Sequence, residues 1–145
     1  ILTDMLVSNR SDVIASVATY SGGYWNNPAN VDALLGVAVT WPEYTATQGY
    51  PQLLLHGGTT DLFDLAIVQL HFDQYAEADA TFLGERGHDT IVCDHGQGHS
   101  APVPGMGPEQ LIEFFADHPY GTVDSPYAGG LPGDYADYCE FRSKL

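Results

Sequence analysis

The sequence predicts an α/β protein with a mostly parallel sheet. Three short apolar runs have the composition of buried strands, at residues 13–18, 52–56 and 89–93. Segments with helical apolar spacing lie beside or between them, and each strand runs into a polar loop. This alternation is typical of parallel sheets that are covered by helices on both faces.

The N-terminal elements follow from local spacing. Residues 1–9 have the apolar periodicity of a helix with one buried stripe. No capping residue precedes this helix at Ile1, which indicates a processed or truncated product whose N-terminal part lies elsewhere. A turn leads to the strand at 13–18. Residues 24–51 are predicted to be irregular, apart from a short helix around 30–37.

The second half of the chain continues the alternation. After the strand at 52–56 and its glycine-bearing loop, residues 62–80 are predicted to form one long helix packed on the sheet. A further helix begins at Pro108, with proline in its first turn, and ends near His118. Residues 119–145 are rich in Gly, Pro and Tyr and are predicted to be a tail without regular structure.

Length and charge limit the function classes. The chain has 145 residues, enough for one domain with a hydrophobic core, and shows no internal boundary. Its 19 acidic and 4 basic residues give a formal net charge of −15. Such a surface repels nucleic acid and anionic lipid, so neither is expected as a partner. No apolar run reaches the roughly 18 residues that a membrane span needs, and no signal peptide is visible.

An acid and a histidine follow two of the predicted strands. Asp61 lies in the loop after residues 52–56, and His99 lies in the loop after residues 89–93. Because the carboxyl ends of parallel strands meet at one edge of a sheet, the two side chains can meet. A carboxylate on one imidazole nitrogen fixes the tautomer, and the other nitrogen then takes a proton from a nucleophile. The alternative is a pair of unrelated loop residues.

Two segments resemble α/β-hydrolases. Residues 51–61, Pro-Gln-Leu-Leu-Leu-His-Gly-Gly-Thr-Thr-Asp, are similar to the strand and loop that carry the acid in that fold. Residues 92–102, Val-Cys-Asp-His-Gly-Gln-Gly-His-Ser-Ala-Pro, are similar to its histidine loop, and the helix with Phe114 and Phe115 matches the one that follows. The most similar group is the secreted polyhydroxybutyrate-depolymerase and feruloyl-esterase-like branch, with its dienelactone-hydrolase-like relatives. The resemblance covers residues 1–118.

The resemblance implies that residues 1–145 are the C-terminal part of one α/β-hydrolase domain, with 119–145 as its tail. It implies a serine esterase that acts on small-molecule or polymeric esters, with His99 moving the proton and Asp61 orienting His99. It implies no cofactor. Two other readings stay open: a peptidase of the same fold, and a non-catalytic binding module that kept the fold.

The nucleophile is expected outside this chain. In this fold the triad order is Ser, Asp, His, and the serine sits in a G-x-S-x-G turn between a strand and a helix. No such motif occurs here; Ser21 comes nearest, but Thr19 stands where the first glycine should be. The helix at 1–9 would then be the one after the nucleophile, and the serine and oxyanion hole would lie upstream of Ile1, in a separate chain or a missing segment. This chain alone is expected to be inactive.

Other polar side chains compete for these roles. Asp64 and Asp94 are alternatives to Asp61, and we rank them behind it as helix-start and surface groups. His95 and His99 have the i, i+4 spacing of a zinc pair, but the two glycines between them argue against a helix. No metal site is therefore expected, and His95 is predicted to have a supporting role.

Aromatic residues of the irregular segment are candidates for substrate binding. Tyr24, Trp25 and Trp41 offer flat apolar faces that suit acyl, aromatic or polymeric substrates. The alternative is that they pack this segment onto the body of the protein. Val103 and Met106, after the histidine loop, are further candidates for the pocket wall.

The two cysteines suggest a link between the tail and the sheet. Cys93 ends a predicted strand and Cys139 lies in the tail. A disulfide between them would restrict the unfolded chain and would imply an oxidising compartment. With the resemblance, this predicts a secreted or periplasmic protein. Two free thiols, or bonds to the missing half, are the alternatives.

Overall fold

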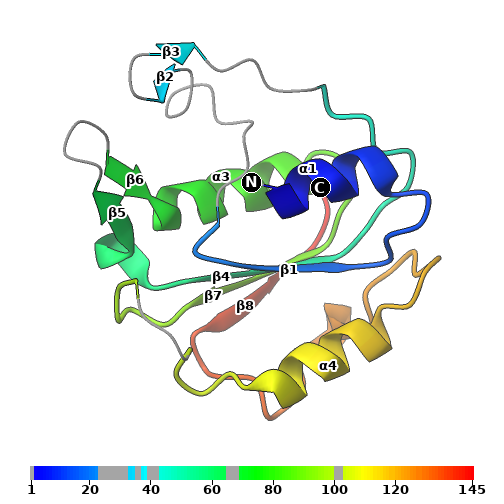
Figure 1. Ribbon diagram of the computed structural model, residues 1–145. Helices are drawn as coiled ribbons and strands as arrows, with labels where there is room; N and C mark the ends of the chain where they lie inside the picture. The colour runs from blue at the N-terminus through cyan, green and yellow to red at the C-terminus, as the bar shows by residue number, and fades with distance from the viewer. Residues whose placement is uncertain (1, 23–32, 35–36, 39–42, 65–68, 100–102) are drawn as a thin grey trace.

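A four-stranded sheet lies between helices in a mixed α/β arrangement (Figure 1). The computed structural model describes residues 2–22, 33–34, 37–38, 43–64, 69–99 and 103–145. Helices α1 and α3 cover one face of the sheet and α4 covers the other. The predicted α/β class is thus confirmed at this level. No helix in the described ranges is long and apolar enough to cross a membrane.

The sheet has the order β1-β4-β7-β8. Strands β1 (Val17–Tyr20), β4 (Gln52–His56) and β7 (Thr90–Asp94) are parallel, and β8 (Cys139–Arg142) runs antiparallel to β7. Strand β4 has the predicted bounds and β7 is shifted by one residue. Strand β1 begins four residues later than predicted, because the amides of Val13 and Ile14 donate to the Arg10 carbonyl and complete the turn after α1.

The helices confirm part of the periodicity argument. Helix α1 (Leu2–Arg10) and helix α4 (Pro108–Asp117) lie where the sequence predicts them. The single helix predicted over 62–80 is wrong in its first half. There β5 (Leu62–Asp64) and β6 (Gln69–His71) form an antiparallel ribbon, and α3 (Phe72–Gly84) begins only afterwards. Residues 62–72 are apolar at most positions, a pattern that fits a strand as well as a helix.

Two further predictions of local structure fail. A helix is predicted around 30–37, but the residues described in this range belong to a short antiparallel pair of strands, β2 (Ala33–Leu34) and β3 (Val37–Ala38). The C-terminal tail, predicted to lack regular structure, contains a 3-10 turn, η2 (Pro126–Gly129), and adds β8 to the sheet.

The predicted disulfide is confirmed. Cys139 of β8 lies directly opposite Cys93 of β7 and is bonded to it, with no free cysteine in the chain.

The core is divided between the two faces of the sheet. Successive residues of β4 point to opposite faces: Leu53 and Leu55 pack towards α4 and the tail, and Leu54 packs towards α3. All five residues of β4 are buried, which explains why its three central residues are apolar without alternation. The main residues of the α4 side are Leu53, Leu55, Ile91, Cys93, Met106, Phe114, Tyr127 and Tyr135.

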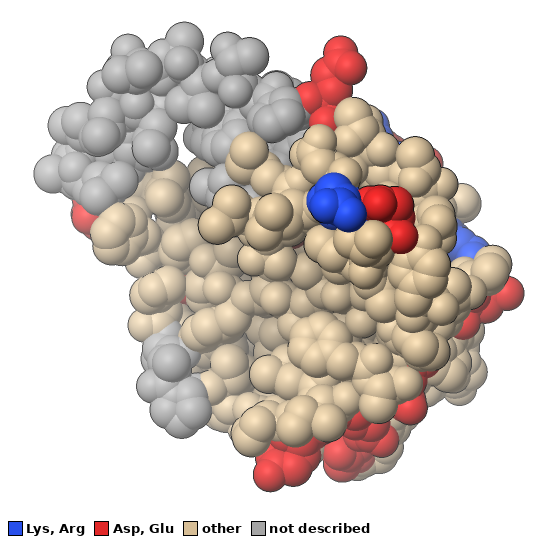
Figure 2. Space-filling view, turned by 45° about the vertical axis from the view of Figure 1, so that its right-hand side comes forward, with Lys and Arg blue, Asp and Glu red and all other residues tan. Residues whose placement is uncertain are grey.

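The surface carries the acidic excess of the sequence. Figure 2 shows one face, on which red acidic groups outnumber blue basic ones. All four basic side chains lie in ion pairs with carboxylates: Arg10 with Asp12, Arg86 with Glu85, Arg142 with Glu77, and Lys144 with Asp124.

Candidate active site

The structure brings Asp61 and His99 together at the carboxyl edge of the sheet. Asp61 follows β4 and the 3-10 turn η1 (Gly58–Thr60), and His99 lies in the loop after β7. Both loops lie beside the β5–β6 ribbon (Figure 1). Nδ1 of His99 lies 2.8 Å from Oδ1 of Asp61. A carboxylate only accepts hydrogen bonds, so Nδ1 carries the proton in this pair.

The Asp61 carboxylate is fully buried and accepts three hydrogen bonds. Its Oδ2 atom accepts hydrogen bonds from the Ser21 hydroxyl at 2.7 Å and from the Gly57 amide at 2.8 Å. With the bond to His99, both oxygens are occupied by donors from three parts of the chain. These hydrogen bonds offset the free-energy cost of removing the carboxylate from water, and they fix the direction of each oxygen.

His99 reaches from this buried acid to the surface. Its side chain is 51% exposed, whereas that of Asp61 is 0% exposed. The imidazole lies nearly parallel to the rings of Tyr20 and Phe72, with centroids 6.5 and 5.2 Å away. Among the residues that the structure describes, none forms a hydrogen bond with Nε2 of His99. The ring is therefore oriented by Asp61 and by aromatic contacts, with its second nitrogen available to an external group.

Close backbone contact locks the two loops together. The Gly98 amide donates to the Gly57 carbonyl at 2.8 Å. A Cβ atom on residue 57 would lie 2.0 Å from the Gly98 carbonyl oxygen, so only glycine fits there. Gly98 itself has a φ of +72°, in the left-handed region that glycine adopts without steric cost. The separation of Asp61 and His99 is thus set by backbone rather than by flexible side chains.

Neither alternative acid hydrogen-bonds to His99. Asp94 accepts a bond from the Gly96 amide at 2.9 Å and shapes the turn of the histidine loop. Asp64 lies on the exposed part of the β5–β6 ribbon, where it accepts a bond from Gln69 at 3.2 Å. Of the three acids considered, Asp61 is the one that contacts the imidazole.

His95 supports the same loop from inside. Its side chain is buried, its Nδ1 accepts a bond from the Gln97 amide at 3.3 Å, and its Nε2 lies 3.4 Å from the Tyr20 hydroxyl. These contacts fit the predicted supporting role. Within the described part of the chain, no three His, Cys, Asp or Glu side chains are grouped so that they could hold a metal ion.

An apolar cavity lies next to the pair. It has a volume of about 410 Å³ and lies between the end of β1 and the start of α4. Val103 and Met106 line it, as the sequence suggests, together with Tyr20, Leu55 and Leu111. Tyr20 therefore forms a wall of this cavity and also stacks on His99. The predicted substrate-binding residues Tyr24, Trp25 and Trp41 lie outside the described residues.

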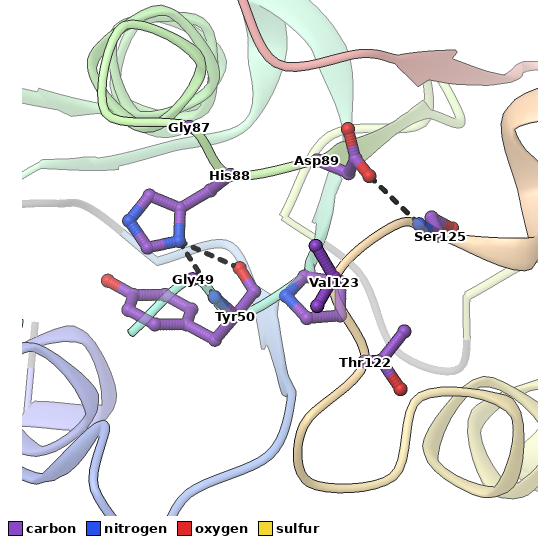
Figure 3. Close-up of a pocket in the computed structure, with 9 residues that line it drawn as sticks. Gly49, Tyr50, Gly87, His88, Asp89, Thr122, Val123 and Ser125 are labelled. Carbon is purple, nitrogen blue, oxygen red and sulfur yellow. Dashed lines mark hydrogen bonds between the residues drawn. The ribbon is translucent and has the colours of Figure 1, made fainter. Parts of the chain in front are cut away.

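A second pocket lies at the opposite end of the strands (Figure 3). Its volume of about 10 Å³ has room for one water molecule. Its polar groups are bonded to one another: the Tyr50 amide donates to Nδ1 of His88 at 2.9 Å, and the Ser125 amide donates to Asp89 at 3.0 Å. Burial lowers the pKa of His88. This pocket joins the tail to the sheet through the bond between Ser125 and Asp89.

Sequence reasoning missed three features of the site. Ser21 follows β1 as Asp61 follows β4. Because the carboxyl ends of parallel strands meet at one edge of the sheet, the argument that pairs Asp61 with His99 also predicts that Ser21 lies near them. The stacking of Phe72 on His99 could not be predicted once residues 62–80 were assigned to a single helix. The approach of Gly57 to Gly98 depends on two loops far apart in sequence, and only the glycines themselves signal it.

Comparison of the chain with protein-family models, with curated proteins and with solved structures found no match. No family assignment follows from these comparisons. The chemistry of the site is therefore inferred from its geometry.

Proposed function

We propose that this chain supplies the acid and the general base of a serine esterase, Asp61 and His99, within an α/β-hydrolase fold. The observation that carries the proposal is the hydrogen bond between the half-exposed imidazole of His99 and the fully buried carboxylate of Asp61, which accepts three hydrogen bonds in all. A surface ion pair would not need an acid that is buried and held from three sides. This arrangement instead suits a histidine that must keep one tautomer while its other nitrogen reacts.

The chemistry follows from the protonation of His99. With Nδ1–H directed at Asp61, the lone pair on Nε2 accepts the proton of a serine hydroxyl as the serine oxygen attacks the ester carbonyl. Asp61 stabilises the imidazolium that forms. The imidazolium then gives its proton to the departing alkoxide. Water next attacks the acyl-serine ester while His99 takes its proton, and the imidazolium returns a proton to the serine oxygen as the acid product leaves.

The strand arrangement supports an upstream nucleophile. The acid follows β4, the histidine follows the neighbouring parallel strand β7, and α4 comes after the histidine loop. Among the described residues, no strand pairs with the outer edge of β1. In the proposed fold, the strand before the nucleophile pairs with that edge, and α1 is the helix after it. The serine and the oxyanion donors would then precede Ile1.

The cavity supports the kind of substrate, and the disulfide supports the compartment in which the protein works. An apolar cavity that shares Tyr20 with the histidine suits the acyl or aromatic part of an ester, from a small molecule or a polymer. The Cys93–Cys139 disulfide suits an oxidising compartment, and we propose a secreted or periplasmic protein.

The test is turnover of p-nitrophenyl esters by the complete protein. His99→Ala should abolish turnover, whereas Asp12→Asn, a change at an exposed carboxylate after α1, should leave turnover unchanged. Circular dichroism of both variants checks that they fold. Full turnover by folded His99→Ala would refute the assignment.

A fluorophosphonate probe separates the alternatives. Labelling of a serine upstream of Ile1 supports the proposal, and labelling of Ser21 would place the nucleophile within this chain. Absence of both labelling and ester turnover would favour a binding module. Preferential cleavage of peptides over esters would identify a peptidase.

A further inference from the structure

Ser21 has a backbone conformation that serine rarely adopts. Its φ is +43°, and it is the one non-glycine residue with positive φ among those that the structure describes. Its amide donates to the Leu55 carbonyl at 2.9 Å, which continues the pairing of β1 with β4 by one residue. Its side chain is buried. Glycine would adopt this conformation without steric cost, so a serine here needs a reason in its hydroxyl group.

The hydroxyl is used on the Asp61 carboxylate. It donates to Oδ2 at 2.7 Å, a distance typical of a charge-assisted hydrogen bond. Oδ2 is the oxygen that does not contact His99. With the Gly57 amide on the same atom, Ser21 holds Oδ2 so that the carboxylate cannot rotate without breaking bonds at both oxygens.

We propose that Ser21 is a positioning residue that acts through Asp61. Its hydroxyl fixes the rotation of the carboxylate and so keeps Oδ1 directed at Nδ1 of His99. The inference rests on the proposed function, and it assigns to Ser21 a role different from that of the nucleophile. A nucleophile would give its proton to Nε2 of His99, whereas the Ser21 proton is directed at the acid.

Two variants separate the hydroxyl from the backbone. Ser21→Ala removes the hydroxyl and keeps a side chain in the left-handed conformation; Ser21→Gly removes the hydroxyl and relieves the conformation. In the complete protein, both should lower kcat for p-nitrophenyl esters roughly tenfold, the loss expected for one charge-assisted hydrogen bond, with KM changed less than about twofold. Ser21→Gly should do so while melting no lower than Ser21→Ala. A purely structural role would instead spare kcat in Ser21→Gly.

A second measurement needs no substrate. The 15N shifts of the neutral His99 imidazole report which nitrogen carries the proton. The wild type should be mainly the Nδ1–H tautomer, and both variants should show a larger Nε2–H fraction. If the complete protein hydrolysed no ester, this tautomer measurement would still decide the role of Ser21.

Three results would overturn the inference. The first is wild-type kcat and wild-type tautomer populations in folded Ser21→Gly. The second is a loss of kcat in Ser21→Ala alone, which would trace the effect to the backbone. The third is fluorophosphonate labelling of Ser21.

Discussion

Replacement of Gly57 by alanine should damage both stability and activity. Gly57 has a φ of −99°, which alanine also adopts, so the effect comes from contact alone. The new Cβ would lie 2.0 Å from the Gly98 oxygen and 2.5 Å from its carbonyl carbon, where ordinary contacts begin at 3.4 Å. The two loops must therefore separate by about 1.4 Å, the difference between 3.4 Å and 2.0 Å. Asp61 and His99 lie on opposite sides of this contact.

The magnitude follows from what the separation breaks. Steric overlap in a packed site costs about 1–3 kcal/mol, and loss of the bond from Gly98 to Gly57 adds about 1 kcal/mol. Together these lower the melting temperature by roughly 10 °C for a protein of this size. A misplacement of about 1 Å at the proposed catalytic pair is expected to cost on the order of 100-fold in kcat.

The assay is thermal unfolding and p-nitrophenyl ester turnover of the complete protein. Gly133→Ala is the matched control, because a Cβ at Gly133 meets no atom within 4 Å. The control should behave as the wild type. Wild-type melting and turnover in Gly57→Ala would show that the loops do not approach as described and would refute the reasoning.

Two further predictions concern the body of the fold. Replacing both Cys93 and Cys139 by alanine should lower the free energy of unfolding by about 3–4 kcal/mol, since the bridge closes a loop of 46 residues; equal urea midpoints for the variant and the oxidised wild type would contradict this. Burial lowers the pKa of both His88 and His118 below the unfolded value near 6.5, so the unfolded chain binds more protons below that pH. Their contribution to stability is therefore present above about pH 6.5 and lost as the pH falls through the window below it. The melting temperature should drop between pH 7.5 and 5.5, and His118→Asn should reduce the drop; an equal drop in the variant would exclude His118 as a cause.

The sequence predicts best what depends on local pattern and strand direction. Strand β4 has its predicted bounds because Leu53, Leu54 and Leu55 are each buried, on alternating faces. The meeting of Asp61 with His99 follows from parallel strands that end at one edge. These inferences need only the residues and the geometry of a parallel sheet.

What the sequence does not predict depends on partners distant along the chain. Strand β8 forms because the tail returns to the free edge of β7; Cys139 signals that return, but no periodicity in the Gly- and Pro-rich segment marks a strand there. The ribbon at 62–71 has apolar residues at most positions, so periodicity cannot distinguish it from a helix. Ser21 has its role only because β1 pairs with β4, which places its hydroxyl against Asp61.

The base of the β5–β6 ribbon has a consequence for how this protein can vary. Asp61 follows β4 and η1, and the ribbon leads to Phe72 at the start of α3, whose amide donates to the Asp61 carbonyl at 2.9 Å. This bond closes the intervening segment at its root and ties Asp61 to the start of α3. We therefore expect a change in the length of this segment to leave the acid aligned with His99. The β5–β6 ribbon is therefore a position where a designed segment could change the access of ligands to His99 while Asp61 and His99 are kept.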